Sequence, residues 1–407
     1  MNLHPELGYF DEGLDFVEAK IYSDVIRPFG QAHTLPHAAY RSKVFADLED
    51  EKIWTRTWVC IGTQQEIPDE GDILPFTVGN HGIHVQRVKD GKLVGRFNKA
   101  QHGGCRSVPL QCQTGNKTKC SFTSCGYSRD RNVLSAVEVE EGSLLGGQYL
   151  GDRPERLLPV QVECWGPFIF INLDHSTKSL SKCVKRLSKV MGKTIHGKLD
   201  LVYQERAENQ CNWKLMGRSF VENVSIPDVK DGYEKYSGVS NQTPMQTMKS
   251  LNLSDNYATR DGTLPLLQGI SSNKKHKAHL IWHFPNLLLI QMPNYIYSII
   301  LQPTGIGLTL GRINLFVNNT AGINQDDPNV IALSSKWLKE LEKSVIHGEK
   351  LQRDMQNLTK SGLKSSLKLT QKENCPYGYD FQKFIVDSIL AKHKYYWSAP
   401  LYNDHDR

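Results

Sequence analysis

Short strand-like runs separated by turn residues fill residues 60–175, and they restrict this zone to a β-rich fold. Typical runs are GDILPFTVG, GIHVQRVKDGKLVGRFN and PFIFINLD. The pair Asp90-Gly91 lies between two strand-like halves of the second run. This dipeptide favours a tight β-hairpin turn, because both residues tolerate a positive φ. The sequence therefore predicts a compact all-β domain over residues 46–175.

A second set of strand-like runs follows from residue 176, mixed with helical patterns. The strand-like runs are HKAHLIWHFPNLLLIQM and NYIYSIILQPTGIGLTLGRINLFVNN. A long helix is predicted near the C-terminal end, where apolar residues recur with helical spacing at Leu333, Trp337, Leu338, Leu341 and Val345. Residues 176–407 are predicted to form an α+β domain, and residues 1–45 an arm with a helix start that packs against it.

Two further segments have helical patterns. The first approximates one apolar helical face with Val44, Phe45, Leu48, Ile53 and Trp54. The second, SLSKCVKRLSKVMGK, predicts a basic surface helix. A lysine-rich helix face of this kind is usually just solvated.

Composition narrows the class of protein. With 407 residues, 39% hydrophobic and 23% charged residues and a net charge of +6, the chain is typical of a globular protein of one large or two medium domains. This charge does not by itself indicate nucleic acid. The sequence shows neither an apolar leader nor an apolar run of about 18 residues, so we expect no membrane span. Nine cysteines, an odd number, favour reduced thiols or metal ligands and a cytoplasmic location.

Cysteines concentrate in one stretch, NKAQHGGCRSVPLQCQTGNKTKCSFTSCGY, over residues 98–127. It contains Cys105, Cys112, Cys120, Cys125 and His102. This density is typical of a metal site, but the spacings fit none of the usual two-pair zinc templates. The stretch predicts either a metal site or the remains of one.

Four segments in order resemble the α-subunits of Rieske-type non-haem iron oxygenases, also called ring-hydroxylating oxygenases. They are IWTRTWVCIGTQQEIPDEGDILPFTVGNHGIHVQRVKDGKLVGRFN, LLPVQVECWGPFIFINLD, NQCNWKLMGRSFVEN and WHFPNLLLIQMPNYIYSIILQPTG. The resemblance covers nearly the whole chain and is strongest to members that form α-only trimers, such as choline-monooxygenase-like and demethylating enzymes. It implies a Rieske-like all-β domain followed by a helix-grip-like catalytic-type domain, an antiparallel sheet with helices.

The resemblance also implies a [2Fe-2S] cluster, which needs Cys-x-His and Cys-x-x-His motifs. This chain has Ala100 and His102 at the first motif, and Phe122 and Cys125 at the second. Alanine and phenylalanine cannot bind iron, so we expect no ordinary Rieske cluster.

The mononuclear iron of the family is held by two histidines and a carboxylate. Ser225 and Lys230 stand at the two histidine positions, and Glu222 stands where the family places an acid that bridges cluster and iron. The third ligand falls near Gly348 on the predicted C-terminal helix, where Glu349 or Asp354 could reach the site. A protonated lysine cannot bind a cation, so we expect this iron to be absent as well.

Other side chains leave alternatives open. His102, Cys105, Cys120 and Cys125 could bind a structural zinc, with Cys112 as a substitute, or these thiols could be leftover packing groups or hold an atypical cluster. Phe122 could plug the loop tips instead. We expect Glu222 to be compensated by Lys230 or Arg218. The histidines His276, His279 and His283 lie in a strand-like run, too far apart for one metal, and are expected to be ordinary surface or partly buried residues.

Three functions remain after this comparison. The first is a catalytically silent α-like subunit that assembles with an active oxygenase α-subunit and stabilises or regulates it. The second is a metal-free enzyme that uses Glu222, Ser225 and Lys230. The third is an active oxygenase with atypical ligands. For the first we expect a homotrimer, either alone or stacked on a trimer of the active chain as a heterohexamer, with no nucleic acid or membrane partner.

Overall fold

The structure, a computed structural model, describes residues 13–97, 135–137, 158–238, 246–255, 257, 264–271, 275–318, 322–360 and 376–392. The chain divides into two compact units. The β unit contains Asp50–Lys182, and the α+β unit contains Cys183–Lys392 together with the N-terminal segment up to Glu49. No helix among the described residues is long and apolar enough to cross a membrane.

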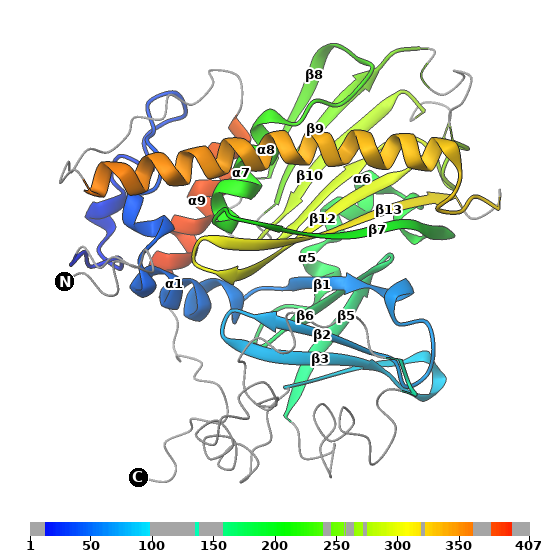
Figure 1. Cartoon of the computed structure of the whole chain (residues 1–407), viewed down its shortest axis with the longest axis horizontal. Helices are drawn as coiled ribbons and strands as arrows, with labels where there is room; N and C mark the ends of the chain where they lie inside the picture. Colours follow the sequence, from blue (N-terminus) through cyan, green and yellow to red (C-terminus); the bar gives the residue numbers. More distant parts are fainter. Residues whose placement is uncertain are drawn as a thin grey trace. The chain divides into compact units, whose positions relative to one another are not determined.

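The β unit is built on an antiparallel sheet of six strands in the order β1-β6-β5-β4-β3-β2 (Figure 1). The predicted hairpin is confirmed: Asp90 and Gly91 have φ values of 64° and 70° and lie between β3 and β4, which pair from Arg87↔Leu93. The strands are β1 (Val59–Thr63), β2 (Ile73–Val78), β3 (His81–Arg87), β4 (Leu93–Phe97), β5 (Pro159–Trp165) and β6 (Phe168–Asn172).

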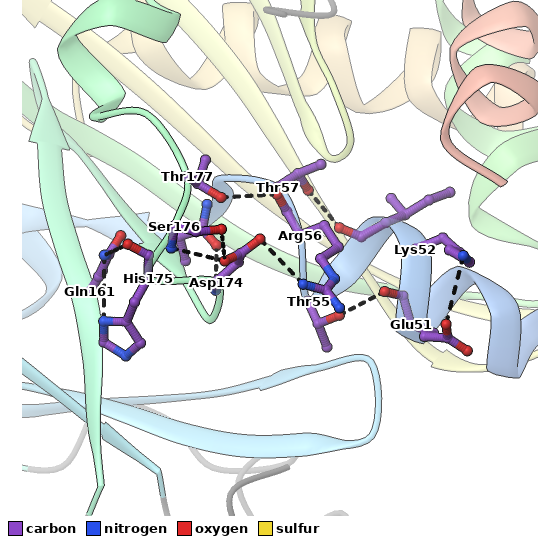
Figure 2. Close-up of polar contacts among 12 residues, drawn as sticks. Glu51, Lys52, Thr55, Arg56, Thr57, Gln161, Asp174, His175, Ser176 and Thr177 are labelled. Atoms are coloured by element: carbon purple, nitrogen blue, oxygen red, sulfur yellow. Dashed lines mark hydrogen bonds and ion pairs between the residues drawn. The ribbon is translucent and has the colours of Figure 1, made fainter. Parts of the chain in front are cut away.

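Polar contacts tie the segment before β1 to the loop after β6. Figure 2 shows Arg56 reaching Asp174, with Nη1 and Oδ2 3.4 Å apart, while Thr177 Oγ1 donates to the Arg56 carbonyl at 3.5 Å. The Asp174 carboxylate also accepts from the Ser176 amide at 2.9 Å. Burial raises the pKa of Asp174, but the hydrogen bonds from Ser176 and the charge of Arg56 outweigh it and lower the pKa. The carboxylate therefore stays ionised and fixes this loop.

The α+β unit is built on an antiparallel sheet of seven strands in the order β7-β13-β12-β11-β10-β9-β8. Its central strands are buried on both faces; every residue of β11 is buried, for example. The strands are β7 (Leu199–Asn209), β8 (Val229–Gly238), β9 (Gln246–Leu253), β10 (Lys277–His283), β11 (Leu287–Gln291), β12 (Ile296–Gly305) and β13 (Leu308–Asn318).

Three main helices accompany this sheet: α7 (Trp213–Asn223), α8 (Pro328–Lys360) and α9 (Pro376–Leu390). The long helix α8 runs across the sheet in Figure 1, and α7 packs against α8, α9 and strands β12 and β13. The predicted apolar face of α8 is confirmed at Trp337, Leu341 and Val345, which are buried, whereas Leu333 and Leu338 are half-buried. Helix α7 therefore lies at the meeting point of the sheet and two helices.

The shorter helices differ in part from the prediction. Helix α1 ends at Glu49 (Lys43–Glu49) and continues as a π-helical segment, Asp50–Trp54. Phe45 is buried as predicted, but Val44 is 40% exposed, and the polar Glu49 is buried. The basic segment forms two short helices, α5 (Leu180–Cys183) and α6 (Lys185–Met191), because Val184 between them has a ψ of 3°. The single predicted helix was therefore wrong, although its lysines are exposed.

Candidate functional site

Helix α7 carries three charged side chains four residues apart, Lys214, Arg218 and Glu222, which places them on one helix face. Asn212 caps the start of the helix, and its side-chain oxygen accepts from the Lys214 amide at 3.0 Å. All residues from Trp213 to Val221 are buried. Since an unpaired buried charge is costly, this row of charges has to be compensated inside the unit.

Lys214 pairs with Glu49 of α1. Its Nζ lies 2.6 Å from Glu49 Oε1, and the two side chains are 1% and 6% exposed. The ammonium also lies 5.5, 5.2 and 5.5 Å from the ring centroids of Tyr40, Phe45 and Trp213. Burial lowers the pKa of Lys214, and the charge of Glu49 counteracts this shift. The pair anchors the N-terminal segment to α7.

Arg218 pairs with Glu222 one turn further along α7. Arg218 Nε donates to Glu222 Oε1 at 2.8 Å, and Nη1 donates to Gln382 Oε1 of α9 at 3.1 Å. The same Gln382 oxygen accepts from the Leu35 amide at 2.9 Å. Burial lowers the pKa of Arg218, but the carboxylate of Glu222 and the hydroxyl of Tyr40 outweigh it and raise the pKa. Of the two residues expected to compensate Glu222, the structure therefore selects Arg218.

Two glycines allow close packing around α7. A Cβ atom at Gly378 of α9 would lie 1.8 Å from Glu222 Oε1, and a Cβ atom at Gly217 would lie 2.2 Å from Trp282 Cη2 of β10. The Trp282 ring stacks on Phe381 of α9 at 3.7 Å between centroids. The space between α7, α9 and the sheet is thus filled by aromatic rings and by the Arg218–Glu222 pair.

Ser225 and Lys230 have partners of their own. The Ser225 amide donates to Glu340 Oε2 of α8 at 3.2 Å. Lys230 Nζ lies 2.6 Å from Asp255 Oδ2 in a pair whose side chains are 47% and 78% exposed. The structure therefore does not bring Glu222, Ser225 and Lys230 together as one reactive group.

The carboxylate of α8 near Ser225 is Glu340, which the sequence reasoning missed. Glu349 instead accepts from the Gln210 amide at 3.2 Å, next to the start of α7. Glu222 lies near the other end of this helix, roughly 14 Å along its axis from Trp213. Asp354 is exposed. The expectation that the third iron-ligand position lies near Gly348 was therefore wrong. Helices α7 and α8 run antiparallel, which brings Glu340 to Ser225 and Glu349 to the start of α7. Sequence spacing does not reveal this crossing.

These residues do not fit a mononuclear iron. Glu222 is engaged by a guanidinium, Ser225 contributes a backbone amide to Glu340, and Lys230 is a cation paired at the surface. Within the described parts of the chain, no three histidine, cysteine, aspartate or glutamate residues are grouped so that they could hold a metal ion. No reaction step through such an ion follows from this geometry.

His279 and His283 lie on β10, which confirms the strand character of this run, and His276 directly precedes the strand and is half-buried, as expected. His279 and His283 are buried, so the expectation of surface or partly buried residues was wrong for both. His279 Nδ1 lies 2.8 Å from Ser250 Oγ, and His283 Nδ1 lies 3.0 Å from the Phe284 carbonyl oxygen. Each ring is held by its own neighbour, as in an ordinary core.

The cluster positions Ala100, His102, Phe122 and Cys125, and the zinc candidates Cys105 and Cys120 with them, lie outside the described residues. The described cysteines Cys60, Cys164, Cys183 and Cys211 form no disulfide. The predicted zinc site therefore stays a prediction.

A surface groove of about 450 Å³ lies between β7 and α8. Its charged lining residues are Glu205, Lys339 and Glu342. None of Glu222, Ser225 and Lys230 lines this groove, so it does not belong to the predicted site.

Curated proteins similar to this chain are oxygenase subunits. Spinach (Spinacia oleracea) chloroplastic choline monooxygenase is 25% identical over 205 residues, 48% of this chain and 44% of that protein. The carnitine monooxygenase oxygenase subunit of Escherichia coli is 23% identical over 195 residues, 47% of this chain and 50% of that protein. The chain thus spans about half the length of the curated relatives it matches. No protein-family model matches it.

Solved structures show the same fold over nearly the whole chain. A quaternary ammonium Rieske monooxygenase superposes with a TM-score of 0.62 at 18% identity and covers 91% of this chain and 98% of its own. The chain is related to the α-subunits of Rieske-type oxygenases. Naphthalene 1,2-dioxygenase from Rhodococcus sp. superposes with a TM-score of 0.61 at 16% identity, covering 92% and 97%. The predicted α+β class, a Rieske-like β domain with a catalytic-type domain, is confirmed.

Proposed function

We propose that this Rieske-oxygenase-like chain is a catalytically silent α-like subunit, which assembles with an active oxygenase α-subunit and stabilises or regulates it. The observation that carries the proposal is the contact of Arg218 Nε with Glu222 Oε1 at 2.8 Å. The acid that the resemblance assigns to bridging cluster and iron is here the partner of a buried guanidinium. This carboxylate therefore serves the packing of α7 and α9.

The substitutions support the same proposal from two independent places. Oxygenase chemistry of this class needs both an electron-entry cluster and an oxygen-binding iron. Ala100 and Phe122 replace ligands at the first, and Ser225 and Lys230 replace ligands at the second. A chain that lacks either centre cannot pass electrons from the cluster to the iron.

The assembly we propose is a homotrimer of this chain stacked face to face on a trimer of the active chain. One related solved structure is described in terms of inter-subunit electron transfer, which is a property of that protein. A silent chain inside such a ring would interrupt the relay, whereas a stacked ring leaves the relay of the active ring intact. In a closed ring every subunit has a neighbour on each of its interfaces. Permanent interfaces between subunits commonly bury more than about 2,000 Å².

The two enzymatic alternatives have less support. A metal-free enzyme would need Glu222, Ser225 and Lys230 to converge, but Glu222 and Lys230 bind different partners, Arg218 and Asp255. An oxygenase with atypical ligands could recruit Glu340 near Ser225, but Glu340 Oε1 already pairs with Lys343 Nζ at 2.6 Å.

The test is quantification of iron, acid-labile sulfide and zinc in the purified chain. We expect no [2Fe-2S] cluster, no mononuclear iron and no red-brown Rieske absorption. Zinc at about one ion per chain would assign His102, Cys105, Cys120 and Cys125 to a structural site, and chelation should then lower the melting temperature. Two irons with matching sulfide per chain would refute the silent-subunit proposal.

A further inference from the structure

The chain passes from the α+β unit into the β unit between Glu49 and Asp50, and these neighbouring acids are anchored in different units. Glu49 pairs with Lys214 of the α+β unit at 2.6 Å, and its side chain is 6% exposed. The Asp50 carboxylate accepts from the Asn80 amide of the β unit at 3.3 Å and from Asn80 Nδ2 at 3.0 Å. Two consecutive residues are therefore held by separate units.

The Asp50 carboxylate is half-buried at the start of the β2–β3 hairpin. Its Oδ2 atom lies 3.4 Å from His81 Nε2, the first residue of β3. A Cβ atom at Gly79 would lie 1.7 Å from Asp50 Oδ1, so a glycine at this position lets the carboxylate approach the turn closely. Residues 79–81 thus form a small receptor for this one side chain.

Helical geometry changes at the same point of the chain. Helix α1 ends at Glu49, and the residues that follow it directly, Asp50–Trp54, form a π-helical segment. The Thr55 amide donates to the Asp50 carbonyl at 3.1 Å, five residues back instead of four. π-Helical turns are rare and are found frequently at functional positions.

Threonine hydroxyls stiffen the π-helical segment itself. Thr55 Oγ1 donates to the Glu51 carbonyl at 3.0 Å (Figure 2). Thr57 Oγ1 donates to the Ile53 carbonyl at 2.8 Å. The segment after Asp50 therefore belongs to the β unit as a rigid piece, and a change of backbone angle is easiest just before it.

The chain returns to the α+β unit between Lys182 and Cys183, and the helical geometry is interrupted there as well. Cys183 ends α5, and α6 begins after Val184, whose ψ of 3° separates the two helices. The Cys183 carbonyl accepts from Gln246 Nε2 of the α+β unit at 2.8 Å. Both connections thus combine an interrupted helix with an anchor next to the interruption.

Within the β unit the two connections are tied to each other. Figure 2 shows Arg56 beside Asp174, with Nη1 and Oδ2 3.4 Å apart, and Thr177 Oγ1 donating to the Arg56 carbonyl. Trp58 Nε1 also donates to the Lys178 carbonyl at 2.8 Å. The two connections therefore move together with the β unit.

We propose that residues 49–50 and 183–184 form a two-stranded hinge, and that the carboxylates of Glu49 and Asp50 restrain its angle. Each carboxylate fixes the backbone on its own side, so the φ and ψ angles between them have to absorb a rotation of either unit. Hinges are typically a few residues at the ends of elements. The inference does not depend on the proposed function, since it concerns the covalent connection of the two units.

The experiment measures the width of the distance distribution between spin labels, one in each unit of the full chain, by double electron–electron resonance. Because the chain has nine cysteines, the labels are attached to ketone-bearing unnatural amino acids that replace Lys89 and Lys336, both exposed. Asp50→Ala removes one restraint, and we expect it to broaden the distribution about twofold. The matched control is Asp47→Ala on α1, an exposed acid that pairs with Lys43 and should leave the width unchanged.

A second variant removes the same contacts from the hairpin side and leaves Asp50 in place. It combines Asn80→Ala with His81→Phe, which keeps an aromatic ring against Phe97. It should broaden the distribution as Asp50→Ala does, and it replaces that variant if Asp50→Ala fails to fold. Hydrogen exchange followed by mass spectrometry should show faster exchange at residues 50–57 and unchanged exchange in strands β1–β6.

Three results would overturn the inference. The first is a distribution as narrow as that of wild type in both the Asp50 variant and the hairpin variant. The second is equal broadening by Asp47→Ala, because the width would then not depend on the hinge restraint. The third is faster exchange throughout strands β1–β6, because the broadening would then come from loosening of the whole β unit.

Discussion

Arg218 and Lys230 look interchangeable in sequence as partners for Glu222, but their surroundings differ. Arg218 is 7% exposed and bonds Glu222, whereas Lys230 is 47% exposed and bonds Asp255. Replacing Arg218 by Ala leaves the Glu222 carboxylate without its buried partner, so we expect the free energy of unfolding to fall by about 3 kcal/mol. Urea unfolding followed by circular dichroism measures this change.

Lys230→Ala is the matched control for that experiment. Because exposed ion pairs contribute little, its urea midpoint should coincide with that of wild type. Adding Glu222→Gln to the Arg218→Ala variant should recover part of the loss, since the orphaned charge is then gone. A Lys230→Ala variant less stable than Arg218→Ala would contradict the pairing seen here.

Two buried histidines make stability depend on pH. Burial lowers the pKa of His84 to about 3 and that of His283 to about 4. Below pH 6.5 the unfolded chain takes up protons on these rings while the folded chain does not, so the free energy of unfolding should fall as pH drops from about 6.5 toward 4. Each ring contributes a slope of up to about 1.4 kcal/mol per pH unit.

Urea unfolding at a series of pH values between 7 and 4 tests this expectation. His84→Gln and His283→Gln should each flatten the dependence, whatever their effect on stability at pH 7. A wild-type free energy that stays constant down to pH 5 would refute the assignment.

At the scale of elements, Gly217 decides how closely α7 approaches β10. Alanine normally stabilises a helix relative to glycine, by about 1 kcal/mol. Here a Cβ atom would lie 2.2 Å from the Trp282 ring, which is stacked on Phe381. We expect Gly217→Ala to destabilise the chain by about 1–3 kcal/mol, the cost of overpacking a filled core. The thermal midpoint of the purified variant measures the sign.

The double variant Gly217→Ala with Trp282→Leu separates overpacking from other causes. Removing the ring frees the space, so Gly217→Ala should cost less in the Trp282→Leu background than in wild type. Equal costs in both backgrounds would show that the ring does not set the approach of α7.

Sequence patterns were sufficient for the elements whose cause is local. Asp90-Gly91 specified its hairpin because both residues adopt the positive φ that the turn requires. Trp337, Leu341 and Val345 specified the buried face of α8 by their spacing alone. The exposure of Val44 and the burial of Glu49 were missed, because the Glu49 partner, Lys214, lies 165 residues away in the chain.

The candidate site was less predictable for the same reason. Glu222, Ser225 and Lys230 were found from their positions after the NWK segment, but their partners come from other elements. Arg218 was named as a partner, together with Lys230, because both are near Glu222 in the sequence. Glu340 and Gln382 were not, since they depend on how α8 and α9 cross α7.

At the scale of the whole molecule, the proposed assembly has a distinct stoichiometry. Co-expression with the catalytically complete α-subunit should give a complex of three copies of each chain, because stacked rings close every interface. Native mass spectrometry of the purified complex counts the copies. Mixed rings with variable composition, or a monomer that retains no partner and leaves oxygenase activity and solubility unchanged, would contradict the stacked arrangement.

Rebuilding a path from a cluster to an iron centre in this scaffold takes more than two new histidines, because the bridging acid would have to be released as well. Even with histidine at positions 225 and 230, the Arg218 guanidinium would still hold Glu222 from 2.8 Å, and Gly378 would still bring α9 against that carboxylate. To free this bridging acid, a designer would have to remove the arginine, and the resulting protein would lose stability before it gained the path. The packing of α7 thus makes each single substitution toward an oxygenase site unfavourable. Only several such substitutions made together would restore the residues that oxygen chemistry needs.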